Sequence, residues 1–225
     1  SREQHGRAGE MYEQAEMWKE AADSYREIGF HHQAARAYVK CKHWEDGARC
    51  LEMVIVEEFA RVAGDAVKQQ KRRKLVLQAA KLFKEAGLLD EAQRILEKGE
   101  CYRHAGQIAM QRESFEDAAE LFQRAEDPER AAEALRRLGQ DSEGACLLGV
   151  HRRDHGDDVE AAKLLMDAGE YEQAGDLYRK NEEYLRAGEC FEASGDQRTA
   201  AEMYRAGGDL NRAAVAFEGA EEHLT

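Results

Sequence analysis

Small and large side chains recur along this chain with a period of about 13 residues. Each copy of the pattern has a pair of small residues, followed three positions later by an aromatic or large aliphatic one. On a helix, residues three apart share a face, so each copy presents to neighbouring helices both a large side chain and a small-residue surface on which another side chain can pack. The second small residues are Ala22, Ala35, Ala48, Ala80, Gly106, Ala119, Ala132, Ala145, Ala162, Gly175, Gly188, Ala201 and Ala214.

The large residues follow most of these small ones at the same offset. Gly9 with Tyr12 extends the series toward the N-terminus, Gln93 with Leu96 fills a gap, and a degenerate copy near Ala66 brings the number to about sixteen. The period predicts helices of about ten residues joined by turns of about three. The large residues are Tyr25, Tyr38, Leu51, Phe83, Phe122, Leu135, Leu148, Leu165, Tyr178, Phe191, Tyr204 and Phe217.

Turn signals fall at the predicted helix ends. Glycines lie about seven residues after the small pair, where a left-handed residue ends a helix; they are Gly29, Gly87, Gly139, Gly169, Gly195 and Gly208. Three of them precede an acid that is expected to cap the next helix, namely Glu170, Asp196 and Asp209. The segment Asp127-Pro128-Glu129 predicts another helix start, with Asp127 as cap and proline at the first helical position.

Helices of about ten residues are not stable alone in water, so these helices must stack on one another. The chain therefore predicts an all-α fold, a right-handed solenoid of about eight short antiparallel helical hairpins over residues 1–225. The few β-branched runs, such as residues 54–56, lie inside longer helical periodicity and predict no strand. Because the pattern begins almost at residue 1 and reaches Glu221 without a clear polar cap, we expect a fragment of a larger protein.

Two interruptions break the period and predict irregular joints near residues 52–78 and 149–160. The spacing is 32 residues between Ala48 and Ala80 and 17 between Ala145 and Ala162. The second interruption predicts a lengthened turn around residues 155–158. Extra residues in a repeat array often emerge on the face where partners bind.

Several copies resemble tetratricopeptide-type repeats, most clearly the segments 21–25, 118–122, 174–178 and 200–204. Two units here span about 26 residues, where that family has about 34, and the proline that closes each family repeat is absent except for Pro128. The closer likeness is to the short, degenerate repeats of coatomer, intraflagellar-transport and SNAP-type adaptor proteins. The resemblance implies a non-catalytic scaffold that holds a peptide, a helix or another subunit.

The composition limits the setting of the protein. Its five cysteines, Cys41, Cys50, Cys101, Cys146 and Cys190, are odd in number and scattered, which favours a reducing, cytoplasmic compartment. Cys50 and Cys190 share one repeat position, which favours packing over chemistry. No stretch approaches the roughly 20 apolar residues of a membrane span, and the start of the chain has no signal-peptide pattern.

Charge is unevenly distributed along the chain. The formal net charge is −13, and residues 156–225 hold 17 acidic residues against 7 Lys and Arg, a net charge of −10. Such a surface can steer a protein or peptide partner that is basic. The excess of acidic residues is also explained by solvated helix faces that keep the protein soluble, and we favour this second interpretation.

A basic cluster interrupts the acidic composition at Lys68, Lys71, Arg72, Arg73 and Lys74. It is the one sequence feature that suggests nucleic-acid binding, because Lys and Arg side chains attract phosphate groups. Without interleaved aromatic residues for base stacking, we do not expect nucleic-acid binding. An exposed helix, or a surface that pairs with acidic residues of a partner, is the favoured interpretation.

The sequence predicts no enzyme, metal or cofactor. Cys41, His43 and Cys50, or Cys101 with His104, do not have the paired spacings of tetrahedral zinc sites. His151 and His155 flank a charged segment without an activated nucleophile. Abundant carboxylates single out no acid–base pair.

The function predicted is therefore a protein-interaction scaffold or adaptor. The alternative is a structural spacer or assembly segment of a larger coat, transport or multidomain complex. A third and less favoured hypothesis, a nucleic-acid-associated accessory domain, rests on the basic cluster alone. The aromatic residues of the pattern are expected in the core. Candidate partner-binding residues lie off the pattern, and Trp18 and Tyr184 stand out because the repeat rule does not require them; the full set is Trp18, Arg26, Tyr102, Arg103, Arg137 and Tyr184.

Overall fold

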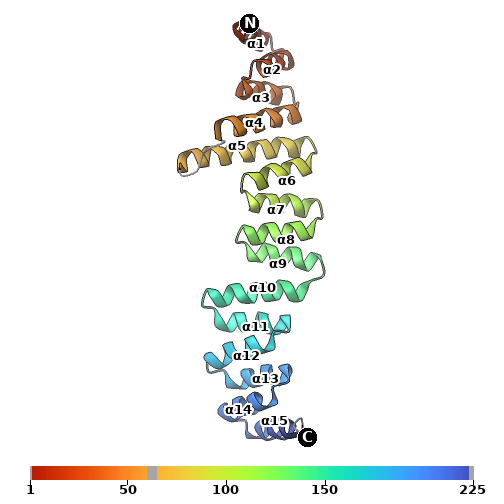
Figure 1. The fold of residues 1–225 in the computed structure, drawn as a ribbon. Coiled ribbons are helices and arrows are strands. Elements are labelled where there is room, and N and C mark those ends of the chain that lie inside the picture. The colour runs from red at the N-terminus through yellow and green to blue at the C-terminus, as the bar shows by residue number, and fades with distance from the viewer. Residues whose placement is uncertain (1, 60–64, 223–225) are drawn as a thin grey trace. The chain divides into compact units, whose positions relative to one another are not determined.

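The computed structural model describes residues 2–59 and 65–222, and the described chain is all α-helical with no strand. It forms two compact units, residues 1–125 and 126–225 (Figure 1). The helices of unit 1 are α1 (Arg2–Gln14), α2 (Trp18–Glu27), α3 (His31–Lys40), α4 (Trp44–Phe59), α5 (Ala66–Glu85), α6 (Leu89–Lys98), α7 (Tyr102–Gln111) and α8 (Phe115–Arg124). Those of unit 2 are α9 (Pro128–Arg137), α10 (Asp141–Asp154), α11 (Asp158–Ala168), α12 (Tyr171–Lys180), α13 (Tyr184–Ser194), α14 (Gln197–Ala206) and α15 (Leu210–Glu222).

The period of 13 residues is confirmed by the helix lengths. Eight of the described helices have ten residues each, and most turns between helices have three. Within each unit every helix packs against the next one in the chain. Each unit is thus a solenoid-like stack of short antiparallel helices, as the sequence predicts.

Stacking depends on a fixed offset of 16 residues between a small and a large side chain. The large residue is the eighth of its helix. The small one is the fifth residue of the preceding helix where that helix has ten or eleven residues, and it lies later, at Gly9 and Gly149, in the longer α1 and α10. Where the small residue is glycine, a methyl group in its place would lie about 2.5–3.0 Å from the large side chain, closer than a normal contact. The pairs that show this are Gly9–Tyr25, Gly106–Phe122, Gly149–Leu165, Gly175–Phe191 and Gly188–Tyr204.

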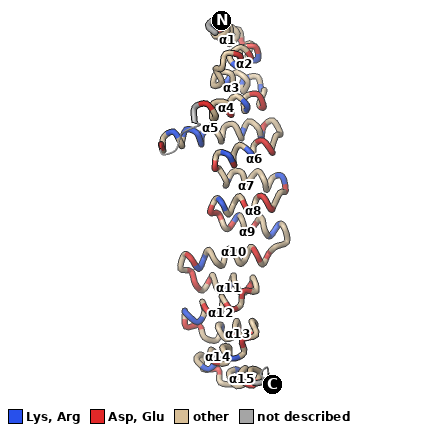
Figure 2. The backbone as a smooth tube through the Cα atoms, viewed as in Figure 1, with Lys and Arg blue, Asp and Glu red and all other residues tan. Residues whose placement is uncertain are grey.

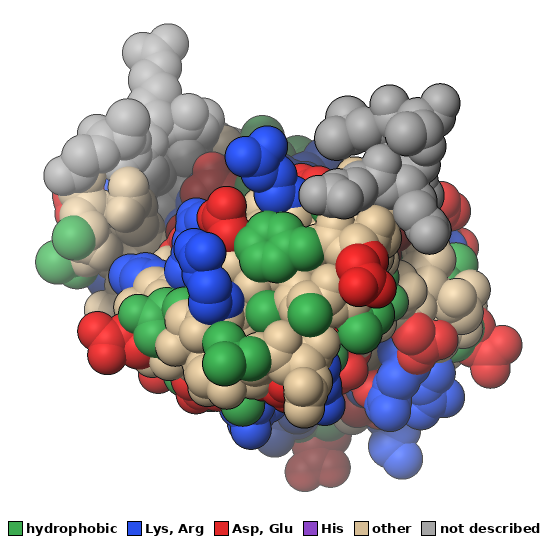
Figure 3. All heavy atoms as spheres, turned by 90° about the horizontal axis from the view of Figure 1, so that it is seen from below, with side chains coloured by type: hydrophobic (Ala, Val, Ile, Leu, Met, Phe, Trp, Pro, Cys, Tyr) green, Lys and Arg blue, Asp and Glu red, His purple; other side chains and the backbone are tan. Residues whose placement is uncertain are grey.

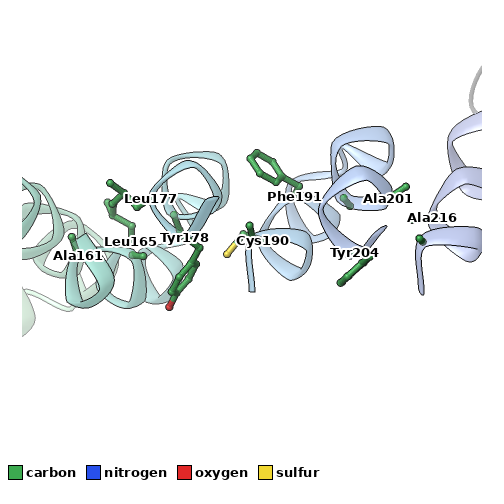
Figure 4. Close-up of a cluster of buried hydrophobic side chains, with 14 residues drawn as sticks. Ala161, Leu165, Leu177, Tyr178, Cys190, Phe191, Ala201, Tyr204 and Ala216 are labelled. Carbon is green, nitrogen blue, oxygen red and sulfur yellow. The ribbon is translucent and has the colours of Figure 1, made fainter. Parts of the chain in front are cut away.

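The large residues of the pattern form the core, as predicted. In unit 2, Leu165, Tyr178, Phe191 and Tyr204 are almost fully buried among small residues. Figure 4 shows Tyr178 and Tyr204 on one side of the stack and Phe191 on the other. Alternate helices therefore direct their large side chains to opposite sides, and helices two apart share a layer. The copies that do not fit are Tyr12, which is exposed, and Leu148 and Phe217, which are half-buried.

The turns follow one geometry. The left-handed residue is the middle one of each three-residue turn and the first one of the two-residue turns at Gly169 and Gly195, with φ between 76° and 88° at the six predicted glycines. Other turns place a charged residue in this conformation, which the glycine signal did not reveal: Glu16, Lys42, Glu100, Glu113, Glu126 and Glu182 have φ between 53° and 61°. These exposed turns hold a conformation that glycine adopts at lower cost.

The predicted helix caps are confirmed in part. Asp196 and Asp209 accept hydrogen bonds from the backbone N–H groups of Thr199 and Arg212, at 3.0 Å each, and Pro128 is the first residue of α9. Glu170 and Asp127 occupy cap positions, but neither side chain caps its helix. The Glu170 carboxylate accepts from the Gln173 side chain at 3.0 Å, and Asp127 forms an ion pair with Arg130 at 3.6 Å.

Both interruptions contain long helices. In the first, α4 has 16 residues and α5 has 20; residues 60–64 of this joint lie outside the described residues. The degenerate copy near Ala66 is not a separate unit, since Ala66 begins α5. In the second, α10 has 14 residues and its turn keeps the usual three, so the predicted lengthened turn is wrong. The extra residues continue the helix because they keep its periodicity up to the left-handed Gly156.

Candidate interaction groove

A groove of about 810 Å³ runs between α3 and α5 in unit 1. We call it the α3–α5 groove. One wall is formed by α3 through His32, Ala35, Arg36, Val39 and Lys40, and the other by α5 through Leu75, Gln78, Lys81, Leu82 and Glu85. Between the walls, α4 contributes Trp44 and Leu51.

The helical repeat explains why these side chains meet. The contributing residues of α3 are three or four apart, and so are those of α5, so each set occupies one helical face. Each turn reverses the chain, so α3 and α5 run in the same direction with α4 antiparallel between them. The two walls are therefore helices of one layer, and α4 supplies side chains from the other layer.

The groove is apolar inside and charged at its edges. Val39 is 36% exposed, and Trp44 and Leu75 are half-buried. Apolar side chains that stay accessible between two helices gain free energy when another apolar surface covers them. The charged lining residues are Arg36, Lys40 and Lys81 against one acid, Glu85.

Among the predicted binding residues, Trp18 lies near this groove. It is the first residue of α2 and is half-buried, and the Lys40 ammonium, which lines the groove, lies 5.8 Å from its ring centroid. Such a cation–π contact holds the lysine side chain in place at the groove edge.

The other predicted binding residues of unit 1 lie elsewhere on the structure. Arg26 pairs with Asp23 at 3.2 Å and with Asp46 at 3.4 Å. The Tyr102 hydroxyl accepts from Arg124 at 2.7 Å. Arg103 is exposed on α7. None of these side chains lines the α3–α5 groove.

Two predicted binding residues belong to unit 2. Arg137 is exposed and pairs with Glu133 at 3.2 Å. Tyr184 lines a second, smaller hollow of about 490 Å³ with Leu185, Arg186 and the end of α14. The six predicted residues are thus divided between the units, and the structure does not bring them together as one site.

The reason for favouring Trp18 and Tyr184 does not hold. Both are the first residue of a helix, and so are Trp44, Tyr102, Phe115 and Tyr171. A large ring at this position is a recurring feature of the array, because the same repeat position returns every 13 residues. Their role in binding stays a prediction, but the repeat rule does not distinguish these two residues from the other rings at this position.

The basic cluster forms the first half of α5 (Figure 2). Lys68 pairs with Asp65 at 3.5 Å, and the Arg72 guanidinium donates to the carbonyl of Lys98 at 2.8 Å. Burial raises the pKa of Cys101, an effect that the nearby Arg73 opposes. Lys71 and Lys74 are exposed. The cluster is therefore partly engaged by its own chain and partly directed to solvent.

Hydrophobic side chains are also exposed on α15 in unit 2. Figure 3 shows them gathered on the face seen from below Figure 1. Leu210 and Val215 are each 68% exposed. They stand on an exposed helix surface, in contrast with the apolar side chains of the α3–α5 groove, which lie between helices.

Cys50 and Cys190, two of the five cysteines, are core packing residues. Burial raises the pKa values of Cys50 and Cys190 to about 11, so both thiols are protonated at neutral pH. Both lie in the core, as their shared repeat position predicts. In the part of the chain that the structure describes, no three His, Cys, Asp or Glu side chains are placed to hold a metal ion. Among the described helices, none combines the length and hydropathy of a membrane-spanning segment.

Comparison with known proteins adds little to this picture. No family model matches the chain, and a search of curated proteins found no match. Among solved structures, the chain is similar to the crystal structure of BtubC (BKLC) from P. vanneervenii, at 16% sequence identity over 98% of this chain and 88% of that chain. The TM-score is 0.22, which supports no further argument.

Sequence reasoning missed most residues of the α3–α5 groove. Arg36, Lys40 and Lys81 lie off the repeat pattern, at positions that the sequence presents as ordinary solvated helix surface. One signal was available. Leu75 precedes the Ala80 copy and lies seven residues before Leu82, so the apolar face of this segment extends beyond what one repeat needs.

Proposed function

We propose that this chain is a non-catalytic protein-interaction module, a scaffold or adaptor of tetratricopeptide-like short repeats. The observation that carries the proposal is the α3–α5 groove. Its walls are two helices of one layer, and its interior presents Val39, Trp44 and Leu75. A helical or extended segment of another protein placed between the walls would cover these side chains, which is how grooves recognise amphipathic helices.

The size of the groove fits a short segment. The contributing parts of α3 and α5 span about ten residues, or about 15 Å of helix. Two or three apolar anchors of a partner fit along such a length, at helical positions three or four apart. Trp44 supplies a large ring between the walls, and aromatic residues contribute disproportionately to binding energy.

The thiol chemistry supports a non-catalytic role. Protonated, buried thiols such as Cys50 and Cys190 are poor nucleophiles. All five cysteines are free, which supports a reducing compartment, and we propose the cytoplasm.

Affinity capture from the source lysate, read by mass spectrometry, tests the proposal. The baits are the parent chain, a groove variant with Val39→Gln and Leu75→Gln, and a control with Val215→Gln on α15. We expect a discrete partner that the parent and the control retain and the groove variant loses. Circular dichroism confirms that all three baits fold.

Two further baits, Trp18→Ala and Tyr184→Ala, locate the partner if the groove variant still binds it. Loss with Tyr184→Ala and retention by the groove variant would move the interaction to unit 2. Capture of no partner by the parent would contradict the adaptor proposal and favour the spacer alternative.

A further inference from the structure

We propose that the occupant of the α3–α5 groove is an acidic amphipathic helix of another protein, with apolar anchors flanked by Asp or Glu. This inference rests on the proposed function and specifies the class of partner. It departs from the expectation of a basic partner, which came from the acidic C-terminal third of the sequence.

The charge of the groove is unbalanced. Its lining contains Arg36, Lys40 and Lys81 but one carboxylate, Glu85. Within the described residues, none of the three cations forms an ion pair with a carboxylate. Most arginines elsewhere are paired within the chain, including Arg26, Arg49, Arg94, Arg112, Arg137, Arg152, Arg179, Arg186 and Arg212. The groove thus leaves its three cations without a carboxylate partner among the described residues, in a protein that pairs most of its other arginines.

The positive edge of the groove continues along α5. Lys71 lies four residues before Leu75, and Lys74 four before Gln78, so both extend the groove-facing side of this helix. Both are exposed. A helical partner longer than the groove would therefore meet further cations toward the start of α5.

The net charge of the chain does not oppose this pairing. The chain carries −13, but at physiological ionic strength charges are screened beyond about 8 Å. The charges that a bound segment meets are those lining the groove, where cations exceed acids. Carboxylates beside the apolar anchors are the complementary groups.

A protein segment fits better than a nucleic acid. Two of the lining residues, His32 and Trp44, have rings and the apolar remainder is aliphatic, whereas single-stranded nucleic acid needs several stacking rings beside its cations. Apolar anchors of a helix, in contrast, bury against Val39, Leu75 and Leu82.

Selection from a random library of displayed peptides of about fifteen residues tests the inference, because a helix of this length spans the groove and one further turn. The whole chain is the bait. We expect the selected peptides to carry apolar residues three or four apart with Asp or Glu between them. A fluorescent synthetic copy of one such peptide then serves as the binding probe, read by fluorescence anisotropy.

Three protein variants separate the contributions. A groove-charge variant carries Arg36→Glu, Lys40→Glu and Lys81→Glu. A charge control carries Lys19→Glu, Lys84→Glu and Arg205→Glu, which are exposed and do not line the groove. The neutral groove variant carries Val39→Gln and Leu75→Gln.

We expect the probe to bind the groove-charge variant and the neutral groove variant each roughly tenfold more weakly, or worse, and the charge control as well as the parent. A probe with Gln in place of its acids should lose affinity for the parent by a similar factor. Raising the salt concentration should weaken binding of the acidic probe and leave the affinity of the Gln probe nearly unchanged.

The contrary outcomes are distinct. Selected peptides that are neutral or basic, and that the neutral groove variant fails to bind, would overturn the acidic partner while the proposed function stands. If no peptide is selected, or none is sensitive to either groove variant, the inference and the assignment of function to this groove both fail. Binding of a labelled oligouridine that the groove-charge variant loses, at an affinity above that of the peptides, would assign the basic edge to nucleic acid.

Discussion

The ring of Tyr204 covers Gly188 so closely that a methyl group at residue 188 would lie 2.7 Å from ring carbons Cδ1 and Cε1. The Tyr204 hydroxyl also donates to the carboxylate of Glu192, so the side chain is held across α13 from both ends. The fifth residue of one helix and the eighth of the next therefore set the distance between helices. A larger residue at the fifth position forces the stack apart.

This contact predicts that Gly188→Ala destabilises the protein although alanine is the better helix former. The added methyl group forces the ring or the helix to move, at a cost of about 1–3 kcal/mol. Urea unfolding followed by circular dichroism measures the change.

Gly47→Ala is the matched control for that substitution. A methyl group at Gly47 would meet its nearest neighbour, a Leu82 methyl group, at 3.4 Å, an ordinary contact. Here the gain in helix propensity, up to about 1 kcal/mol, is expected to prevail. Equal effects of the two substitutions would show that the offset contact does not limit the spacing of the helices.

The fold was largely predictable because helix stacking requires a 13-residue period of small and large residues, and this period is visible in the amino-acid sequence. Tyr178 and Phe191 had to be large, and the residues beneath them small, for ten-residue helices to be stable at all. The left-handed turn residues were predictable only where they are glycine. Glu113 adopts the same conformation with no compositional signal, since an exposed turn tolerates a modest strain.

The groove was not predictable for a related reason. Positions such as Arg36 and Lys81 are free of the stacking requirement, so the repeat pattern places no constraint on them. Whether such a residue faces open solvent or a groove depends on the packing of helices two apart, here α3 and α5. The broken period indicates that α4 and α5 are long, but it does not predict the shape of the groove that they form with α3.

Glu113→Gly is expected to stabilise the protein. Glu113 has φ of 59°, a conformation that costs an ordinary residue about 1 kcal/mol more than glycine. Glu120→Gly, in the middle of α8 and exposed, should have the opposite effect, a loss of about 1 kcal/mol. Thermal unfolding of both variants decides the matter, and a loss of stability in Glu113→Gly would contradict the prediction.

The stability of unit 1 is expected to fall as the pH drops below the ordinary glutamate pKa of about 4.3. The Arg94 guanidinium donates to both carboxylate oxygens of Glu52, at 2.8 and 3.0 Å, and lowers the pKa of Glu52. A lowered pKa in the folded state means that the unfolded state binds the proton more readily. The contribution is therefore complete above the unfolded pKa and is lost as the pH falls through the folded one.

Glu52→Gln tests this pH dependence. The variant should be less stable than the parent at pH 7, and the difference should shrink as unfolding is measured at successively lower pH toward 3. The exposed Glu120→Gln serves as control and should leave the pH profile unchanged. A constant difference between Glu52→Gln and the parent would rule out the ion pair as the cause.

The packing seam between α6 and α7 reverses the usual order of side-chain sizes. By the 16-residue offset Gln93 of α6 opposes Ala109 of α7, a large residue where others are small and a small one where others are large. Gln93 is buried and accepts a hydrogen bond from Arg112 at 2.6 Å, while its amide donates to Glu97 at 2.8 Å. The buried side chain at the fifth position of α6 is thus polar and hydrogen-bonded, where the other ten-residue helices have a small residue.

This reversal predicts strong coupling between the two positions. Gln93→Ala alone leaves a void and removes one hydrogen-bond partner of Arg112, and Ala109→Leu alone overfills the seam, so each should cost about 1–3 kcal/mol. The double variant recreates the pattern of Ala35 beneath Leu51 and should cost at least about 1 kcal/mol less than the sum of the two. Additive costs in the double-mutant cycle would mean that Gln93 and Ala109 do not share the offset contact, and that this seam packs by another rule.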